Sequence, residues 1–284
     1  GGITIMSPLV KPTDEDGNYA LNPMGTNVSN PFLVALADDF DKRNNLFGNF
    51  YANIDVPFVK GLSYRINYGH NYSWDRHYSS NPYSNSMAGE AYKINSNSYD
   101  WTFDNIVNFK KSIKDVHSID ATLVAGRRYR KFEESNATGT NFNSLRLSYN
   151  DLSQATIQRI TSSAWQESYL YYMGRINYEY KYKYILTATL RQDGFSGFAE
   201  NKKTALFPSI GFGWVLSQED FLKVNAINLL KLRGSYGTNG NLVNRYSSLA
   251  RTNIYPAYVF GDGSATAFGQ QITTLANPNL SWET

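Results

Sequence analysis

Residues 62–74 read LSYRINYGHNYSW, and apolar and polar side chains alternate along this stretch. One parity is mostly apolar or aromatic, whereas the other carries Ser63, Arg65 and Asn67. A period of two places these sets on opposite faces of a β-strand. The stretch is long for a soluble strand, usually about 5–6 residues, and it exceeds the roughly 9–11 residues that a tilted strand needs to cross a bilayer. The pattern therefore favours a membrane-spanning strand.

The same alternation recurs in further tyrosine-rich stretches. The predicted strands span residues 46–56, 62–74, 98–110, 117–130, 169–180, 184–193, 205–217 and 230–240. Short connections such as 57–61 and 181–183 alternate with long ones such as 75–97 and 131–163. Outer-membrane barrels have short periplasmic turns and long extracellular loops. The sequence therefore predicts an all-β fold, a transmembrane antiparallel β-barrel.

The composition is compatible with such a barrel. The 284 residues include 22 Tyr, 16 Phe, 5 Trp and no Cys, and 18% are charged. The mean hydropathy is −0.45 and no run of 18 apolar residues occurs, which excludes a membrane-spanning helix. A barrel strand shows lipid only at every second residue, so it is not excluded. The net charge of +3, with both signs interspersed, gives no reason to expect nucleic acid as a partner.

Three regions follow from the pattern. Residues 1–45 lack periodicity and contain turn formers such as Asn22-Pro23, so we expect an extracellular loop region. Residues 46–240 hold the predicted strands, with short periplasmic turns and long extracellular loops. Residues 241–284 are expected to form an extracellular loop and the start of the next strand. The chain has no leader sequence and stops within this pattern, so we interpret it as an internal piece of a longer protein.

No catalytic or metal-binding pattern is found in the sequence. The three histidines, His70, His77 and His117, do not have the spacing of metal ligands. The Gly-X-Ser-X-Gly motif of nucleophilic serine hydrolases is also absent. We therefore expect no enzyme activity, no metal and no cofactor.

The polar parity of the strands carries charged residues. At mid-depth on a lipid-facing surface, an Arg or Lys costs about 2–4 kcal/mol, so we predict that these side chains face the lumen, around water or against a plug. The alternative is that they pair across strands and only rigidify the wall, and both interpretations stay open. The lumen-facing candidates are Arg65, Asp100, Asp104, Arg175, Arg191 and Arg233.

Aromatic side chains in the predicted long loops are candidate ligand contacts at the mouth of the barrel, where they would stack on sugar rings or peptide side chains. Two other roles are open for them, as girdle residues at the membrane interface or as contacts to a partner lid. The candidates are Tyr78, Tyr83, Trp165, Phe195, Phe198 and Tyr258.

Five segments of the chain carry a resemblance to a known family: GRINY at 174–178, YILTATLRQDG at 184–194, LFPSIGFGW at 206–214, LKLRGSYGTNGN at 230–241 and NPNLSWET at 277–284. They resemble the SusC/RagA family of TonB-linked outer-membrane transporters. The resemblance covers nearly the whole chain. It departs from the family at Phe195-Ser196-Gly197-Phe198, where the family usually has a basic residue before the second Phe.

This resemblance implies a multi-pass outer-membrane protein, of which the chain is the middle portion of a plugged barrel of about 22 strands. It further implies active import of an oligosaccharide or a peptide in Bacteroidota. The implied partners are a SusD-like surface lipoprotein, the TonB–ExbB–ExbD complex acting through a plug outside this chain, and outer-membrane lipid. Two other classes remain open from the sequence, a passive porin or surface adhesin with the same wall, and a soluble carbohydrate-binding β-sandwich.

Overall fold

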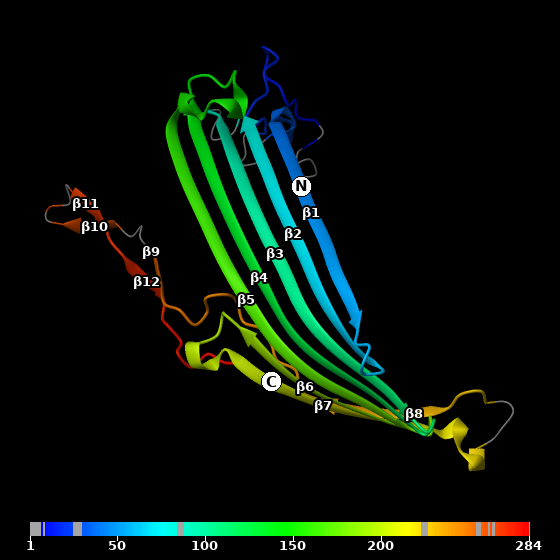
Figure 1. Cartoon of the computed structure of the whole chain (residues 1–284). Helices are drawn as coiled ribbons and strands as arrows, with labels where there is room; N and C mark the ends of the chain where they lie inside the picture. Colours follow the sequence, from blue (N-terminus) through cyan, green and yellow to red (C-terminus); the bar gives the residue numbers. More distant parts are fainter. Residues whose placement is uncertain are drawn as a thin grey trace. The chain divides into compact units, whose positions relative to one another are not determined.

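The alternating stretches form β-strands that pair with one another in chain order. A computed structural model of the chain describes residues 7, 9–24, 30–83, 88–222, 227–253, 257–260, 262 and 265–283. In its main sheet the strand order is β1-β2-β3-β4-β5-β6-β7-β8 (Figure 1). The pairs β5–β6, β6–β7 and β7–β8 are antiparallel. This arrangement confirms the predicted all-β, antiparallel fold, and within this chain the sheet is open, with β1 and β8 at its edges.

The main sheet is followed by short strands, and 3₁₀ segments lie before β1 and in the later connections. The main strands are β1 (Asp38–Asp55), β2 (Leu62–Asn81), β3 (Glu90–Ile113), β4 (His117–Phe142), β5 (Ala155–Tyr180), β6 (Tyr184–Phe195), β7 (Thr204–Val215) and β8 (Lys231–Gly237). The short strands are β9 (Arg251–Asn253), β10 (Ala257–Phe260), β11 (Ala265–Phe268) and β12 (Gln271–Thr274), paired as β10–β11 and β12–β9. The 3₁₀ turns are η2 (Pro31–Leu36), η3 (Ser148–Asn150), η4 (Leu152–Gln154), η5 (Glu200–Lys202), η6 (Leu216–Gln218) and η7 (Asp220–Leu222).

Strands β2 to β5 are longer than the sequence pattern predicts, at 20, 24, 26 and 26 residues. The predicted long connections 75–97 and 131–163 are therefore wrong in extent, and they shorten to 82–89 and 143–154. Likewise, β1 begins at Asp38 rather than at Leu46. The added strand segments lack a sustained alternation: Asp75-Arg76-His77 is polar on both faces, and Ile157 and Ile160 fall on opposite parities of β5. Pairing with neighbouring strands overrides this weak local preference.

Two connections are tight hairpin turns. Lys114 and Asp115 between β3 and β4 have φ of 52° and 53°, and Lys181 and Tyr182 between β5 and β6 have φ of 50° and 56°. Positive φ at both central residues is the type I′ geometry, whose twist matches that of the strands it joins. The short turn predicted at 181–183 is confirmed, and the one predicted at 111–116 is tighter than expected because β3 extends to Ile113.

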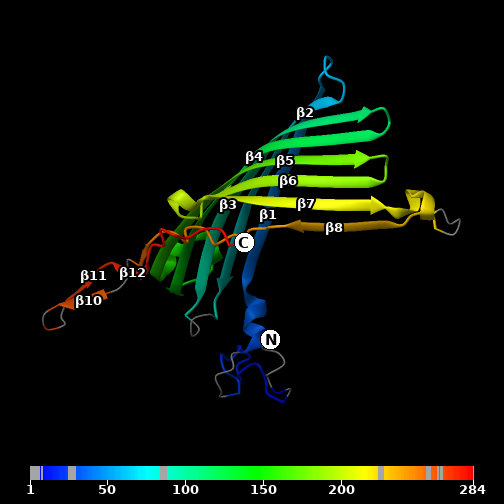
Figure 2. The same ribbon diagram turned by 90° about the horizontal axis from the view of Figure 1, so that it is seen from below.

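The chain divides into two compact units, which are described separately. Unit 1 comprises residues 1–47, 71–99 and 131–165, and unit 2 comprises residues 48–70, 100–130 and 166–284. In unit 2, the strands β6, β7 and β8 lie side by side (Figure 2).

The best-buried part of unit 2 is an aromatic cluster beyond the end of β6. Phe198 is 1% exposed and its ring lies 5.9 Å from that of Phe195 and 4.7 Å from that of Trp282, measured between centroids. The Trp282 indole also donates a hydrogen bond to the carbonyl of Lys203 at 3.0 Å. Trp282 is thereby fixed to the β6–β7 connection. Its neighbour Glu283 makes an isolated bridge with Asn241, and Thr284 lies outside the described residues.

Candidate functional site

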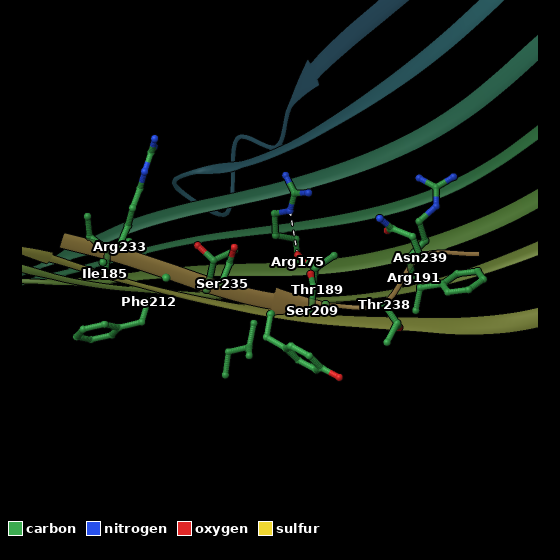
Figure 3. Close-up of a pocket in the computed structure, with 18 of the residues that line it drawn as sticks. Arg175, Ile185, Thr189, Arg191, Ser209, Phe212, Arg233, Ser235, Thr238 and Asn239 are labelled. Atoms are coloured by element: carbon green, nitrogen blue, oxygen red, sulfur yellow. Dashed lines mark hydrogen bonds between the residues drawn. The ribbon is translucent and has the colours of Figure 1, made fainter. Parts of the chain in front are cut away.

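The sheet of unit 2 has two chemically different faces. Arg175, Arg191 and Arg233 project from the same side of β5, β6 and β8, and Phe212 of β7 projects from the opposite side (Figure 3). We call the first side the polar face and the second the apolar face. The register of the pairs gives the same result, because Arg175 lies opposite Thr189, Thr189 opposite Ser209, and Ser209 opposite Gly237.

The apolar face exposes large hydrophobic side chains. Leu190 is 52% exposed, and the same parity on β5 to β8 carries further side chains exposed to between 42% and 77%: Ile176, Leu186, Leu206, Ile210, Phe212, Leu232 and Tyr236. Soluble proteins rarely expose a contiguous apolar surface of this kind, which is typical of contact with lipid or another protein.

A chain of polar contacts crosses the polar face from β2 to β6. The amide of Asn67 donates to Asp104 Oδ2 at 3.5 Å, and the Tyr171 hydroxyl donates to the other oxygen, Asp104 Oδ1. The guanidinium of Arg191 lies 5.0 Å from the centroid of the Tyr171 ring. Arg191 in turn pairs with Asp193, at 2.7 Å between Nε and Oδ2. These contacts connect strands that are not all sequence neighbours.

Gly126 on β4 makes the contact between Tyr171 and Asp104 possible. Because β4 lies between β3 and β5, the Tyr171 side chain must cross β4 to reach Asp104. A Cβ atom at position 126 would overlap the Tyr171 ring and lie 2.5 Å from Asp104 Oδ1. Because glycine has no Cβ, the Tyr171 hydroxyl can reach the Asp104 carboxylate.

A second group of charges surrounds Glu167 on β5, a carboxylate that is only 5% exposed. Arg130 Nη1 lies 2.7 Å from Glu167 Oε1, and Arg245 Nε lies 3.2 Å from Glu167 Oε2. Arg130 and Arg128 also pair with Asp100. Pairing of this kind compensates the desolvation of a buried carboxylate. It also attaches the segment after β8, which carries Arg245, to β5.

A groove of about 830 Å³ lies along β5 to β8. Residues of both faces line it, and its apolar lining residues are Met173, Ile185, Phe207, Ile210, Phe212 and Tyr236. Its cationic residues are Arg175, Arg191, Lys231 and Arg233, and no Asp or Glu is among the described residues that line it. The Arg175 guanidinium donates to Thr189 Oγ1 at 3.2 Å (Figure 3). Hydroxyl and amide groups supply the other polar atoms, from Thr187, Thr189, Ser209, Ser235, Thr238 and Asn239.

The structure brings together some of the charges predicted to face the lumen. Arg175, Arg191 and Arg233 line the groove, and Asp104 belongs to the chain of contacts beside it. Asp100 lies in the group around Glu167. Arg65 is separate, with its guanidinium 4.4 Å from the centroid of the Tyr51 ring. The pairing alternative holds for Asp100 and Asp104, whereas Arg175 and Arg233 have no carboxylate partner among the described residues.

The predicted loop aromatics do not form one site. Tyr78 of unit 1 stacks on Phe40, with centroids 5.5 Å apart, and Lys93 Nζ lies 5.0 Å from its ring centre. Trp165, also of unit 1, stacks on Phe132 at 5.6 Å. Tyr83 is half-buried in unit 1, and Tyr258 of unit 2 is 44% exposed on β10. A ligand contact stays a prediction for these four.

Phe195 and Phe198 require a correction. They are 2% and 1% exposed, so they offer almost no surface to a ligand. The physical reason is that Trp282, far away in sequence, folds back over the β6–β7 connection and packs on Phe198, while Phe195 stacks on Tyr169 at 4.6 Å between ring centroids and contacts Phe198. We assign both to packing.

Sequence reasoning missed Tyr171, Glu167 and the hydroxyl groups of the groove. The alternation on β5 contains a signal for Tyr171, because it has the same parity as Arg175. No comparable signal exists for Glu167, because its partner Arg245 comes from a distant connection.

The connection between β7 and β8 is fixed to the β5–β6 turn by Glu219. Lys183 Nζ lies 3.0 Å from Glu219 Oε2, while Trp214 Nε1 and the Tyr184 hydroxyl donate to Oε1 at 3.1 and 2.8 Å. The hydrogen bond from Lys183, followed by those from Trp214 and Tyr184, lowers the pKa of Glu219 to about 2. The Glu219 carboxylate thus stays ionised well into the acid range.

Two further observations concern the described residues alone. No helix among them is long and apolar enough to cross a membrane. No group of three or more His, Asp or Glu side chains in the described part of the chain is placed to hold a metal ion.

Comparison with protein families and curated sequences gives consistent matches. The family model described as "TonB dependent receptor-like, beta-barrel" matches residues 9–284. The chain is 33% identical to TonB-dependent receptor P3 of Formosa agariphila over 279 residues, which cover 95% of this chain and 27% of that protein. It is 29% identical to TonB-dependent receptor SusC of Bacteroides thetaiotaomicron over 291 residues, with 95% and 27% covered. The chain therefore spans little more than a quarter of the length of these relatives.

Solved structures match the fold. A structure of the RagAB peptide transporter superposes with a TM-score of 0.80 over 95% of this chain and 31% of that chain, at 24% identity. The RagAB peptide importer in its open-open state matches with a TM-score of 0.78 over 96% and 30%, at 25% identity.

Proposed function

The chain belongs to the family of TonB-dependent receptor-like β-barrels, whose members lie in the outer membrane, and on this premise we propose that its full-length protein actively imports a nutrient. In this proposal the apolar face of the sheet contacts lipid and the polar face lines the lumen. The observation that carries the proposal is the family match over residues 9–284, in a chain whose sheet has one apolar and one charged face.

The proposed nutrient is an oligosaccharide or a peptide. SusC is a relative of this chain, and RagAB, which has the same fold, is a peptide transporter. We extend this to a two-component assembly, in which a SusD-like surface lipoprotein covers the extracellular mouth. TonB–ExbB–ExbD would supply the energy through a plug that lies outside this chain.

Uptake in the native host tests the proposal. Cells are given fluorescently labelled oligosaccharides and peptides, and uptake is compared between wild type, a deletion of the full-length gene, and a deletion of TonB. We expect both deletions to abolish uptake of the same compound. Uptake that needs the gene but persists without TonB would refute active import and would favour the alternative, a passive porin, which conducts ions steadily in planar bilayers. Loss of cell attachment without any loss of uptake would favour an adhesin.

A further inference from the structure

In unit 1, three basic side chains lie on the face of the sheet that carries the apolar parity. Strands β1, β2 and β3 lie side by side (Figure 1). Away from the short turn 57–61, the side chains of this parity change from mainly apolar to aromatic and then to basic. In β2, for example, Ile66 is followed by Trp74 and then by Arg76. We call the three basic residues the basic row: Lys42 of β1, Arg76 of β2 and Lys93 of β3.

An aromatic cluster separates the basic row from the apolar part of this face. The Tyr72 ring lies 5.6 Å from that of Trp74 and 6.4 Å from that of Tyr99, measured between centroids. Tyr and Trp are enriched where a bilayer meets water. In outer-membrane barrels the end of the wall that carries the long connections is extracellular. With the apolar face against lipid, the basic row therefore lies at the level of the outer-leaflet head groups.

Lys42 and Arg76 lie directly opposite each other on adjacent strands. Two contacts set the register of β1 and β2 here, the stacking of Phe40 on Tyr78 at 5.5 Å between centroids and the 3.2 Å hydrogen bond from Asn44 Nδ2 to the Trp74 carbonyl. Lys42 and Arg76 are each the residue midway between these two contacts. Both are exposed, and neither forms an ion pair with a described residue. Like charges directly opposite on a sheet are destabilising, so this pair is favourable for an anion.

The surroundings of Arg76 are complete within this chain. Arg76 lies on β2, whose two neighbouring strands are β1 and β3, and a plug would lie on the other, lumen-facing side of the sheet. Contacts of Tyr72 with Tyr99 and of Tyr78 with Lys93 place Asn95 of β3 opposite Arg76. The residues around Arg76 on this face include no acid, and they are Phe40, Lys42, Asn44, Trp74, Tyr78, Lys93, Asn95 and Asn97. The positive charge is thus a property of the outer wall itself.

Lys93 is held beside Arg76 by two tyrosine rings. Its Nζ lies 5.0 Å from the centre of the Tyr78 ring and 5.9 Å from that of Tyr149, which belongs to the connection between β4 and β5. Residues that are opposite on antiparallel strands are about 4.5–5.5 Å apart, and diagonal ones about 7–8 Å. Lys42 and Lys93 stand in these two relations to Arg76, so the three long side chains can meet at one phosphate, whose oxygens are strong acceptors.

From this arrangement we propose that the basic row binds the phosphate of an outer-leaflet glycolipid, whose acyl chains lie against the apolar parity of β1 to β3. The exposed amides of Asn95 and Asn97 flank the row. Their oxygens accept hydrogen bonds from tyrosine hydroxyls at 2.7 and 3.4 Å, which leaves the amide nitrogens as donors for the hydroxyls of the sugar. The proposal rests on the lipid-facing side assigned under the proposed function, and it goes beyond import.

Lipid binding by the purified full-length protein in non-ionic detergent tests this. Native mass spectrometry measures the bound fraction during titration with monophosphoryl lipid A, with the same lipid after removal of its phosphate, and with phosphatidylglycerol. We expect monophosphoryl lipid A to bind at least about tenfold more tightly than the dephosphorylated lipid, as for hydrogen bonds between charged groups. Equal binding of these two lipids would overturn the proposal. Equal or tighter binding of phosphatidylglycerol would overturn the choice of a glycolipid.

Variants locate the site. The double variant Arg76→Gln/Lys93→Gln should lose at least about tenfold in affinity for monophosphoryl lipid A. Arg43→Gln/Lys60→Gln is the control that removes the same charge, because Arg43 has the opposite parity on β1 and pairs with Asp41, and Lys60 lies in the short turn. Equal losses in both double variants would contradict the assigned site.

A charge-conserving variant separates binding from folding. Arg76→Lys/Lys93→Arg should retain most of the affinity, and a loss as large as that of the glutamine variant would refute the role of the charges. The difference in electrophoretic mobility between unheated and heated samples shows that each variant is folded. TonB-dependent uptake by a wild-type protein that binds no lipid A would overturn this proposal and leave the import proposal standing.

Discussion

At the scale of single residues, the contact between Tyr171 and Asp104 depends on a glycine that neither residue adjoins in sequence. Gly126 leaves open the space through which Tyr171 crosses β4, and Arg191 covers the same ring. Tyrosine is frequent throughout the strands, and alternation places Tyr171 on the polar face. Its partner, however, is set by the register of three strands, which local sequence does not encode.

We predict that Gly126→Ala destabilises the protein, because the added methyl overlaps the Tyr171 ring and crowds Asp104. Overpacking of this kind typically costs about 1–3 kcal/mol. Urea unfolding of the full-length protein in detergent micelles, followed by tryptophan fluorescence, measures the change. Gly69→Ala is the control, since a Cβ there has no atom within 4 Å. Adding Tyr171→Ala to Gly126→Ala should remove the steric part of the loss. If both glycine variants are equally stable, the proposed crossing is incorrect.

At the scale of elements, hydrophobic alternation predicts a strand correctly where one face of the strand is apolar. It does not detect a strand segment whose two faces are both polar. The interval 62–74 was recognisable because Tyr64, Ile66 and Tyr68 alternate with polar residues. The continuation of this strand to Asn81 is not recognisable from the sequence, because Arg76 and His77 do not continue the alternation. The sequence predicts both Phe195 and Phe198 in a loop, whereas Phe195 is the last residue of β6. Phe198 is covered by Trp282, and no local pattern reports a contact across that sequence distance.

The Glu219 contacts give a prediction for the connection between β7 and β8. Folding lowers the pKa of this carboxyl from its usual 4.5 to about 2, through the Lys183, Trp214 and Tyr184 hydrogen bonds. A carboxyl with a lowered pKa contributes stability at pH values above 4.5, and this contribution is lost as the pH falls toward about 2. We therefore expect Glu219→Gln to lower stability at pH 6 and to reduce the loss of stability between pH 5 and 2.

Urea unfolding of the full-length protein at a series of pH values between 6 and 2 measures this effect. Glu200→Gln serves as the control, because Glu200 is exposed and forms no ion pair in the described part of the chain. A Glu219→Gln variant with the pH profile of the wild type would show that the three hydrogen bonds do not bias the titration of this group.

At the scale of the whole molecule, the two faces of the sheet require different side chains on the same strand, apolar on one face and polar on the other. Leu190 on β6 belongs to the apolar face and is 52% exposed, while its neighbour Thr189 belongs to the polar face and accepts a hydrogen bond from Arg175.

If the apolar face contacts lipid, Leu190→Arg places a charge in hydrocarbon, at a cost of about 2–4 kcal/mol near the mid-plane. Thr189→Arg places the same charge in the lumen and should cost far less. We expect the first variant to assemble poorly in the outer membrane and to unfold at lower urea in lipid vesicles, and the second to resemble wild type. The reverse order would mean that the lipid-facing and lumen-facing sides are exchanged, and equal effects would mean that the sheet does not separate lipid from water.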